Sequence, residues 1–122
     1  MPRAVLDETH IHTAIREKIA GHYRDIIDEV GAAIAANPVV VVGMSQNPAP
    51  KRARKLLGAA GIPHHYLEYG SYFNPGRRRN ALKMWTGWPT LPMVFVKGVL
   101  VGGADDMARL IESGELKAML AV

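Results

Sequence analysis

The chain has 122 residues, of which 48% are hydrophobic and 21% charged, enough for one compact domain with its own core. It contains no cysteine, which excludes disulfides, a cysteine nucleophile and cysteine metal ligands from this chain. No apolar run approaches the roughly 20 residues of a membrane span, and charges near the N-terminus argue against a secretory signal, so we expect a cytoplasmic protein without membrane association.

The net charge of +4 is concentrated in two basic runs, residues 51–55 and 77–79, which suit anionic partners. Nucleic-acid binding would require basic residues interleaved with exposed aromatic residues, or a known motif, and the sequence offers neither. The five histidines predict no metal site, since the adjacent pair His64 and His65 points to opposite faces of a strand.

Apolar residues recur every three or four positions from Ile11 to Ala36, which is the period of an amphipathic helix. One long helix is predicted. A break near Gly21 is the alternative, because glycine costs about 1 kcal/mol against alanine in a helix interior. The β-branched run over residues 39–42 is typical of a central strand that is covered on both faces.

This strand breaks into a loop, and the loop starts the next helix. Asn47 suits the helix N-cap, because its side-chain oxygen can accept from a free backbone N–H, and Pro48 suits the first helical position. A strand that ends at a helix N-terminus also presents unpaired N–H groups and the positive end of the helix dipole, which favour an anion or a thiolate. The two interpretations of Asn47 are compatible.

The rest of the chain alternates helices and strands. The predicted elements are a helix over 48–60, a strand over 64–69, a helix opened by 74–76, strands over 93–96 and 99–101 joined by Lys97-Gly98, a helix starting at 104–106 and a short turn or helix over 115–120. The first two strands imply a parallel crossover, and the last two an antiparallel hairpin. The result is a small mixed sheet with helices on its faces.

From about Ile26 to Leu120 the sequence resembles the glutaredoxin family of the thioredoxin-like superfamily. Residues 88–92 (Trp-Pro-Thr-Leu-Pro) are similar to the Thr-x-Pro loop, whose proline is cis and whose backbone pairs with a bound thiol peptide. Residues 102–106 (Gly-Gly-Ala-Asp-Asp) are similar to the turn that holds the γ-glutamyl end of glutathione. The Trp-Pro-Thr context is most similar to the monothiol branch, which carries iron–sulfur clusters.

The resemblance implies a thioredoxin-like (glutaredoxin) three-layer α/β/α sandwich with a four-stranded mixed sheet. It places a glutaredoxin-like domain over residues 26–122 and an N-terminal helical extension over residues 1–25. The extension is predicted to pack on the sheet or to make a homodimer.

The alignment with the family places residues 47–50 over its Cys-Pro-Tyr-Cys motif, so Asn47 replaces the nucleophilic cysteine and Pro50 the resolving one. Thiol–disulfide exchange needs a thiolate that attacks sulfur, which neither an amide nor a pyrrolidine supplies. The sequence therefore predicts a cysteine-less, redox-inactive member without a catalytic residue. An iron–sulfur cluster held by the chain's own thiolate is not expected either. Met44 stands where the family has a glutathione-binding lysine.

The resemblance implies that the ligand cleft is kept. A cis Leu91-Pro92 bond would present the Leu91 backbone to an extended ligand, and Asp105 near a helix N-terminus could bind an ammonium. The structural alternatives are that Pro92 only bends the chain and that Asp105 only caps a helix. Arg79 matches a basic position that contacts the glycyl carboxylate of glutathione. The predicted ligand-binding residues are Asn47, Arg79, Thr90, Leu91, Pro92, Gly103, Ala104 and Asp105.

The leading hypothesis is a binding protein that recognises glutathione or a thiol-bearing protein partner in this cleft. The alternative is a glutathione-dependent, transferase-like enzyme, in which Asn47 or Ser45 hydrogen-bonds the sulfur of the ligand and the helix N-terminus lowers its pKa. In both hypotheses the thiol arrives with the ligand.

Overall fold

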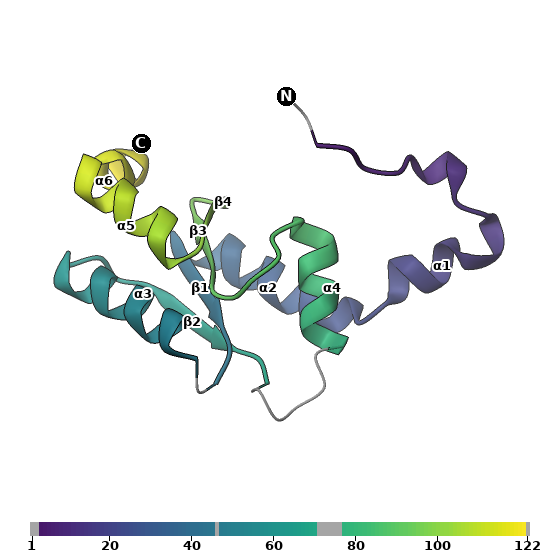
Figure 1. The fold of residues 1–122 in the computed structure, drawn as a ribbon, viewed down its shortest axis with the longest axis horizontal. Coiled ribbons are helices and arrows are strands. Elements are labelled where there is room, and N and C mark those ends of the chain that lie inside the picture. Colours follow the sequence, from purple (N-terminus) through teal and green to yellow (C-terminus); the bar gives the residue numbers. More distant parts are fainter. Residues whose placement is uncertain (1–2, 46, 71–76, 122) are drawn as a thin grey trace.

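Four strands form one mixed sheet in the computed structural model, which describes residues 3–45, 47–70 and 77–121 (Figure 1). The strands are β1 (Val39–Gly43), β2 (His65–Glu68), β3 (Met93–Val96) and β4 (Val99–Gly102). Their order across the sheet is β2-β1-β3-β4, with β2 parallel to β1 and the other two pairs antiparallel. The predicted parallel crossover, hairpin and mixed sheet are confirmed.

β1 is one of the two inner strands, and all five of its residues are buried. Successive side chains of a strand point to opposite faces, so Val39 and Val41 join one hydrophobic cluster and Val40 and Val42 join the other. The unbroken run of valines is thus explained by burial on both faces, as the sequence predicted.

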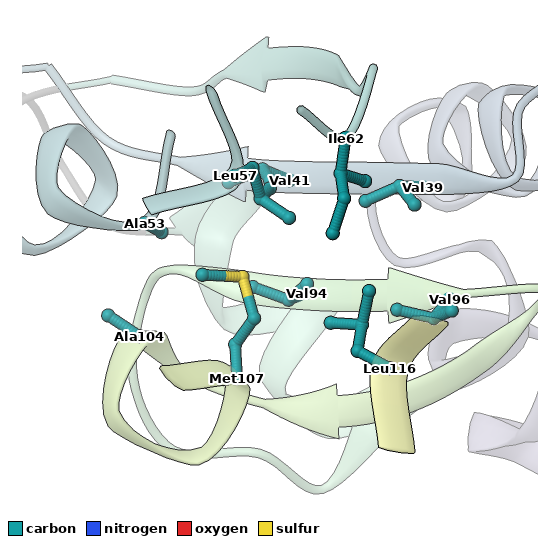
Figure 2. Packing of buried hydrophobic residues seen from close by; sticks show 10 residues of the cluster. All are labelled: Val39, Val41, Ala53, Leu57, Ile62, Val94, Val96, Ala104, Met107 and Leu116. Carbon is teal, nitrogen blue, oxygen red and sulfur yellow. The ribbon is translucent and has the colours of Figure 1, made fainter. Parts of the chain in front are cut away.

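Helices cover both faces of the sheet. The helical elements are η1 (Glu8–His10), α1 (Thr13–Gly21), α2 (Arg24–Ala36), α3 (Pro48–Ala59), α4 (Arg77–Thr86), α5 (Ala104–Ser113) and α6 (Glu115–Ala121). α3, α5 and α6 pack on one face, and α2 and α4 on the other. In Figure 2, Leu57 of α3, Met107 of α5 and Leu116 of α6 pack on the valines of β1 and β3. The expected three-layer α/β/α sandwich is confirmed.

The N-terminal region differs from the single long helix that the periodicity predicts. The helix is interrupted after Gly21, as the alternative prediction of a break near this glycine had it. Tyr23 adopts a left-handed backbone conformation with φ of 46° before α2 begins. α2 buries Ile26 and Val30 against the sheet, whereas α1 buries no residue. Figure 1 shows α1 leading away from the sheet, so the prediction that this part of the extension packs on the sheet is wrong. A homodimer through it stays a prediction.

The hairpin between β3 and β4 turns at Lys97 and Gly98, as predicted. Both residues have positive φ, 52° and 79°, which is the pattern of a type I′ turn and matches the twist of the flanking strands. Glycine at the second turn position adopts this conformation without steric cost. The turn sets the pairing of Val96 with Val99 and so the register of β4.

Candidate ligand cleft

The loops that follow β1 and β4 and the loop that precedes β3 lie at the end of the sheet where β1 ends. The first residue of β3, Met93, pairs with Val42 near the end of β1, and the next residue of β3 pairs with Gly102 at the end of β4. A Cβ added to Gly103 would lie 3.7 Å from the carbonyl oxygen of Pro92. The sheet register therefore brings together the loop before β3 and the glycine turn after β4, two segments that the sequence singled out.

The Leu91-Pro92 peptide bond is cis, as predicted. Pro92 is buried at the start of β3, Leu91 is half-buried against the hydrophobic cluster under α2 and α4, and Thr90 is exposed. This gives the loop a fixed end in the core and an open end toward solvent. Pairing of the Leu91 backbone with a ligand stays a prediction.

Asn47 is the N-cap of α3. Its Oδ1 accepts a hydrogen bond from the backbone N–H of Ala49 at 3.0 Å, and Pro48 occupies the first helical position. The N–H of Ser45 donates to the carbonyl oxygen of Gly70 at 2.9 Å, which ties the loop before α3 to the chain after β2. The cap interpretation of Asn47 is confirmed, while ligand binding at this helix end stays a prediction.

Pro50 lies buried against the last residue of β1. A Cβ added to Gly43 would lie 2.7 Å from the Cβ of Pro50 and 2.8 Å from the phenolic oxygen of Tyr66, closer than such atoms pack. Only glycine leaves room there for both neighbours. Sequence reasoning missed this role of Gly43, because the contact joins a strand, a helix and a second strand.

The phenol of Tyr66 donates a hydrogen bond to Oε1 of Glu68 at 3.0 Å, and the guanidinium of Arg54 lies 4.3 Å from the ring centre. Partial burial, and then the hydrogen bond and negative charge of Glu68, raise the pKa of Tyr66 to about 12. The phenol therefore stays protonated at neutral pH. It acts in packing and hydrogen bonding, not as a general base.

The two aspartates that begin α5 have different partners. Oδ2 of Asp106 accepts a hydrogen bond from the N–H of Gly103 at 3.1 Å, so Asp106 caps the turn. The exposed carboxylate of Asp105 instead accepts from Nη1 of Arg52, on α3, at 2.5 Å. Ala104 is buried. The capping role that the sequence left open for Asp105 is thus filled by its neighbour, and Arg52 was not among the predicted site residues.

Arg79 lies in the first turn of α4, half-buried, in the layer opposite to α3 and α5. It would approach a ligand from the other side of the sheet, and its contact with one stays a prediction. Among the described residues, no group of three or more His, Asp or Glu side chains is arranged to hold a metal ion. In the same part of the chain, no helix is both long and apolar enough to cross a membrane.

Comparison with known proteins agrees with this geometry. The glutaredoxin family model matches residues 39–101. A glutaredoxin-like protein of Dictyostelium discoideum is 47% identical over 98 residues, covering 80% of each chain. Monothiol glutaredoxin-4 of Schizosaccharomyces pombe is 38% identical over 81 residues, which cover 64% of this chain and 32% of that longer protein.

Solved structures show the same relationship. The crystal structure of a buckwheat glutaredoxin–glutathione complex superposes with a TM-score of 0.71 at 25% identity, covering 83% of this chain and 92% of that one. Wheat glutaredoxin gives a TM-score of 0.67 at 31% identity, covering 79% and 91%. The chain belongs to the glutaredoxin family and has its thioredoxin-like fold.

Proposed function

We propose that this protein is a redox-inactive glutaredoxin that binds glutathione, or a thiol-bearing protein partner, without exchanging disulfides. The observation that carries the proposal is the convergence of the cis Leu91-Pro92 loop and the Gly103 turn at one end of the sheet. The capped N-terminus of α3 follows β1 at this end. One related glutaredoxin was crystallised as a glutathione complex, which supports the same ligand class here.

The amino-acid composition supports the first part of this proposal, that the protein is redox-inactive. Exchange with a disulfide requires a thiolate nucleophile, and the chain has no cysteine. An amide caps the helix at the position aligned with the nucleophile, and a buried proline packs at the position aligned with the resolving cysteine. The same lack of thiolates means that the residues present do not fit an iron–sulfur cluster, which cysteine ligands normally hold.

Titration of the protein with reduced and oxidised glutathione tests the second part of the proposal, that the protein binds this ligand. We expect measurable heat by calorimetry, together with NMR shifts of the Leu91 and Asp105 amides. Asp105→Asn removes a charged group beside the Gly103 turn and should change the affinity by up to about fivefold, equivalent to about 1 kcal/mol. The matched control, Asp28→Asn, removes an exposed carboxylate paired with Arg24 on α2 and should leave the affinity unchanged.

Absence of heat and of these shifts at millimolar glutathione would exclude the small-ligand form of the proposal. Capture of the protein by an immobilised thiol peptide, with no binding of free glutathione, would support the partner form. Equal binding by the wild type and Asp105→Asn would show that the ligand lies elsewhere.

A transferase-like activity is the second candidate, and the capping geometry of Asn47 favours it. Because Oδ1 accepts from the N–H of Ala49, the side-chain NH₂ group is left to donate, as a group near a ligand sulfur would need to do. Glutathione plus an electrophilic aryl halide should then give conjugate faster with the wild type than with Asn47→Ala. Equal rates for the two proteins, or no rate above the uncatalysed reaction, would exclude this candidate.

A further inference from the structure

The carboxylate of Asp105 already has a cationic partner within the chain. Nη1 of Arg52 lies 2.5 Å from Oδ1 of Asp105, and this contact joins α3 to α5 across 53 residues of sequence. Asp106 is engaged separately, by the N–H of Gly103 and by Arg109 at 3.6 Å. Asp105 is therefore free of the capping task and is held by Arg52.

A guanidinium in this position changes which ligand charges are favoured beside Asp105. A ligand ammonium that approaches Asp105 meets a carboxylate whose charge is balanced by Arg52, and the two cations repel each other. A ligand carboxylate is attracted by the same guanidinium, which suits carboxylate oxygens geometrically. The γ-glutamyl end of glutathione carries both an ammonium and a carboxylate, so the two effects oppose each other in that ligand.

We propose that Arg52 is a specificity residue that disfavours free amino-acid ends beside Asp105 and favours thiol peptides whose amine is acylated and whose carboxylates are kept. This inference rests on the proposed function and names the ligand class of the same cleft. It assigns Arg52 to the site on its contact with Asp105.

The expected effect is modest, because both side chains face solvent, with exposed fractions of 51% for Arg52 and 76% for Asp105. Exposed ion pairs change an equilibrium by up to about fivefold, and salt screens them. An absolute affinity would mix this effect with the rest of the contacts. The ratio of affinities for two ligands that differ only at the amine isolates it.

The experiment is calorimetric titration of the full chain at low salt with glutathione and with N-acetylglutathione, which share the thiol and both carboxylates. The wild type should bind the acetylated ligand at least as tightly as glutathione. Arg52→Met should shift the ratio toward glutathione by about threefold to fivefold. Lys55→Met is the matched control: it removes one positive charge from the exposed face of the same helix and should keep the wild-type ratio.

Three results would overturn the inference. They are an unchanged ratio in Arg52→Met, an equal shift in Lys55→Met, or a wild-type preference for glutathione. In each of them glutathione still binds, so the proposed function survives. Failure of both ligands to bind any of the three proteins is a different result, and it removes the proposed function together with this inference.

Discussion

A methyl group on Gly43 would collide with the Cβ of Pro50 and the phenol oxygen of Tyr66. Gly43→Ala should therefore lower the free energy of unfolding by about 1–3 kcal/mol, the usual cost of overpacking a core. Urea unfolding measures it. Gly31→Ala is the control, because a Cβ there meets no atom within 4 Å in the middle of α2 and should stabilise the helix by about 0.5–1 kcal/mol. An unchanged stability in Gly43→Ala would contradict this close packing of Gly43 against Pro50 and Tyr66.

Tyr66 should ionise at a higher pH in the folded protein than in the unfolded chain. Its pKa is raised to about 12 by partial burial and by Glu68, so the folded state binds this proton more tightly than the unfolded state does. The resulting stability is fully present below pH 10 and is lost as the pH rises through 12. Absorbance at the phenolate band, compared between the wild type and Tyr66→Phe, measures this titration. A Tyr66 that ionises near pH 10 in the folded protein would contradict it.

The roles of individual residues at the candidate site could be predicted from the sequence where they depend only on neighbouring residues in the chain. The cap at Asn47 follows from one side chain and the next two residues, and the cis bond before Pro92 from a motif of five residues. The pair between Arg52 and Asp105 was not predictable, because it depends on how α3 and α5 are set on the sheet. A basic residue in a helix is usually solvated, and nothing in its neighbours marks Arg52.

At the scale of elements, the N-terminus of α3 is the part of the fold that most directly sets the chemistry at the cleft. A thiol placed there should ionise more readily, because the helix dipole and the first N–H groups stabilise a thiolate. Asn47→Cys gives a chain with a single thiol, whose pKa should lie at least about one unit below the ordinary value of 8.5. The pH dependence of alkylation by iodoacetamide measures it.

The control for this variant is Ala36→Cys, at the exposed C-terminal end of α2. The dipole there has the opposite sign, so its thiol should show no lowering of the pKa. Equal alkylation profiles for the two variants would show that the N-terminus of α3 does not favour a thiolate.

The type of each element could be predicted from the periodicity of the sequence, but the neighbours that each element packs against could not. The valines of β1 and the Lys97-Gly98 turn predicted a buried strand and a hairpin, because burial on two faces and left-handed turn residues leave direct marks in the sequence. The three-to-four residue period continued through Ile15 and Ile19, yet these side chains are 44% and 43% exposed in α1. The period shows which face of a helix is apolar and leaves open what covers that face.

At the scale of the whole molecule, stability should reside in the sheet and the five helices packed on it. Removal of residues 1–21 should change the free energy of unfolding by less than about 0.5 kcal/mol, since no described residue of this segment is buried. Ile26→Ala, which truncates a fully buried side chain in the first turn of α2, should cost about 2–5 kcal/mol. Chemical denaturation of the two variants makes the comparison. A loss of more than about 1 kcal/mol in the free energy of unfolding on truncation would show that residues 1–21 pack on the rest of the protein in solution.

The amide cap at the start of α3 has a consequence for how a bound ligand would be released. An asparagine side chain is not redox-active and forms no mixed disulfide with a thiol. On the proposed function, therefore, no covalent bond would hold the ligand and no reductant would be needed to release it. Occupancy would follow the free ligand concentration by mass action, at any ambient reduction potential that leaves the ligand itself unchanged. Such a protein would report how much ligand is present, whereas a thiol enzyme of the same fold responds to how oxidised the ligand pool is.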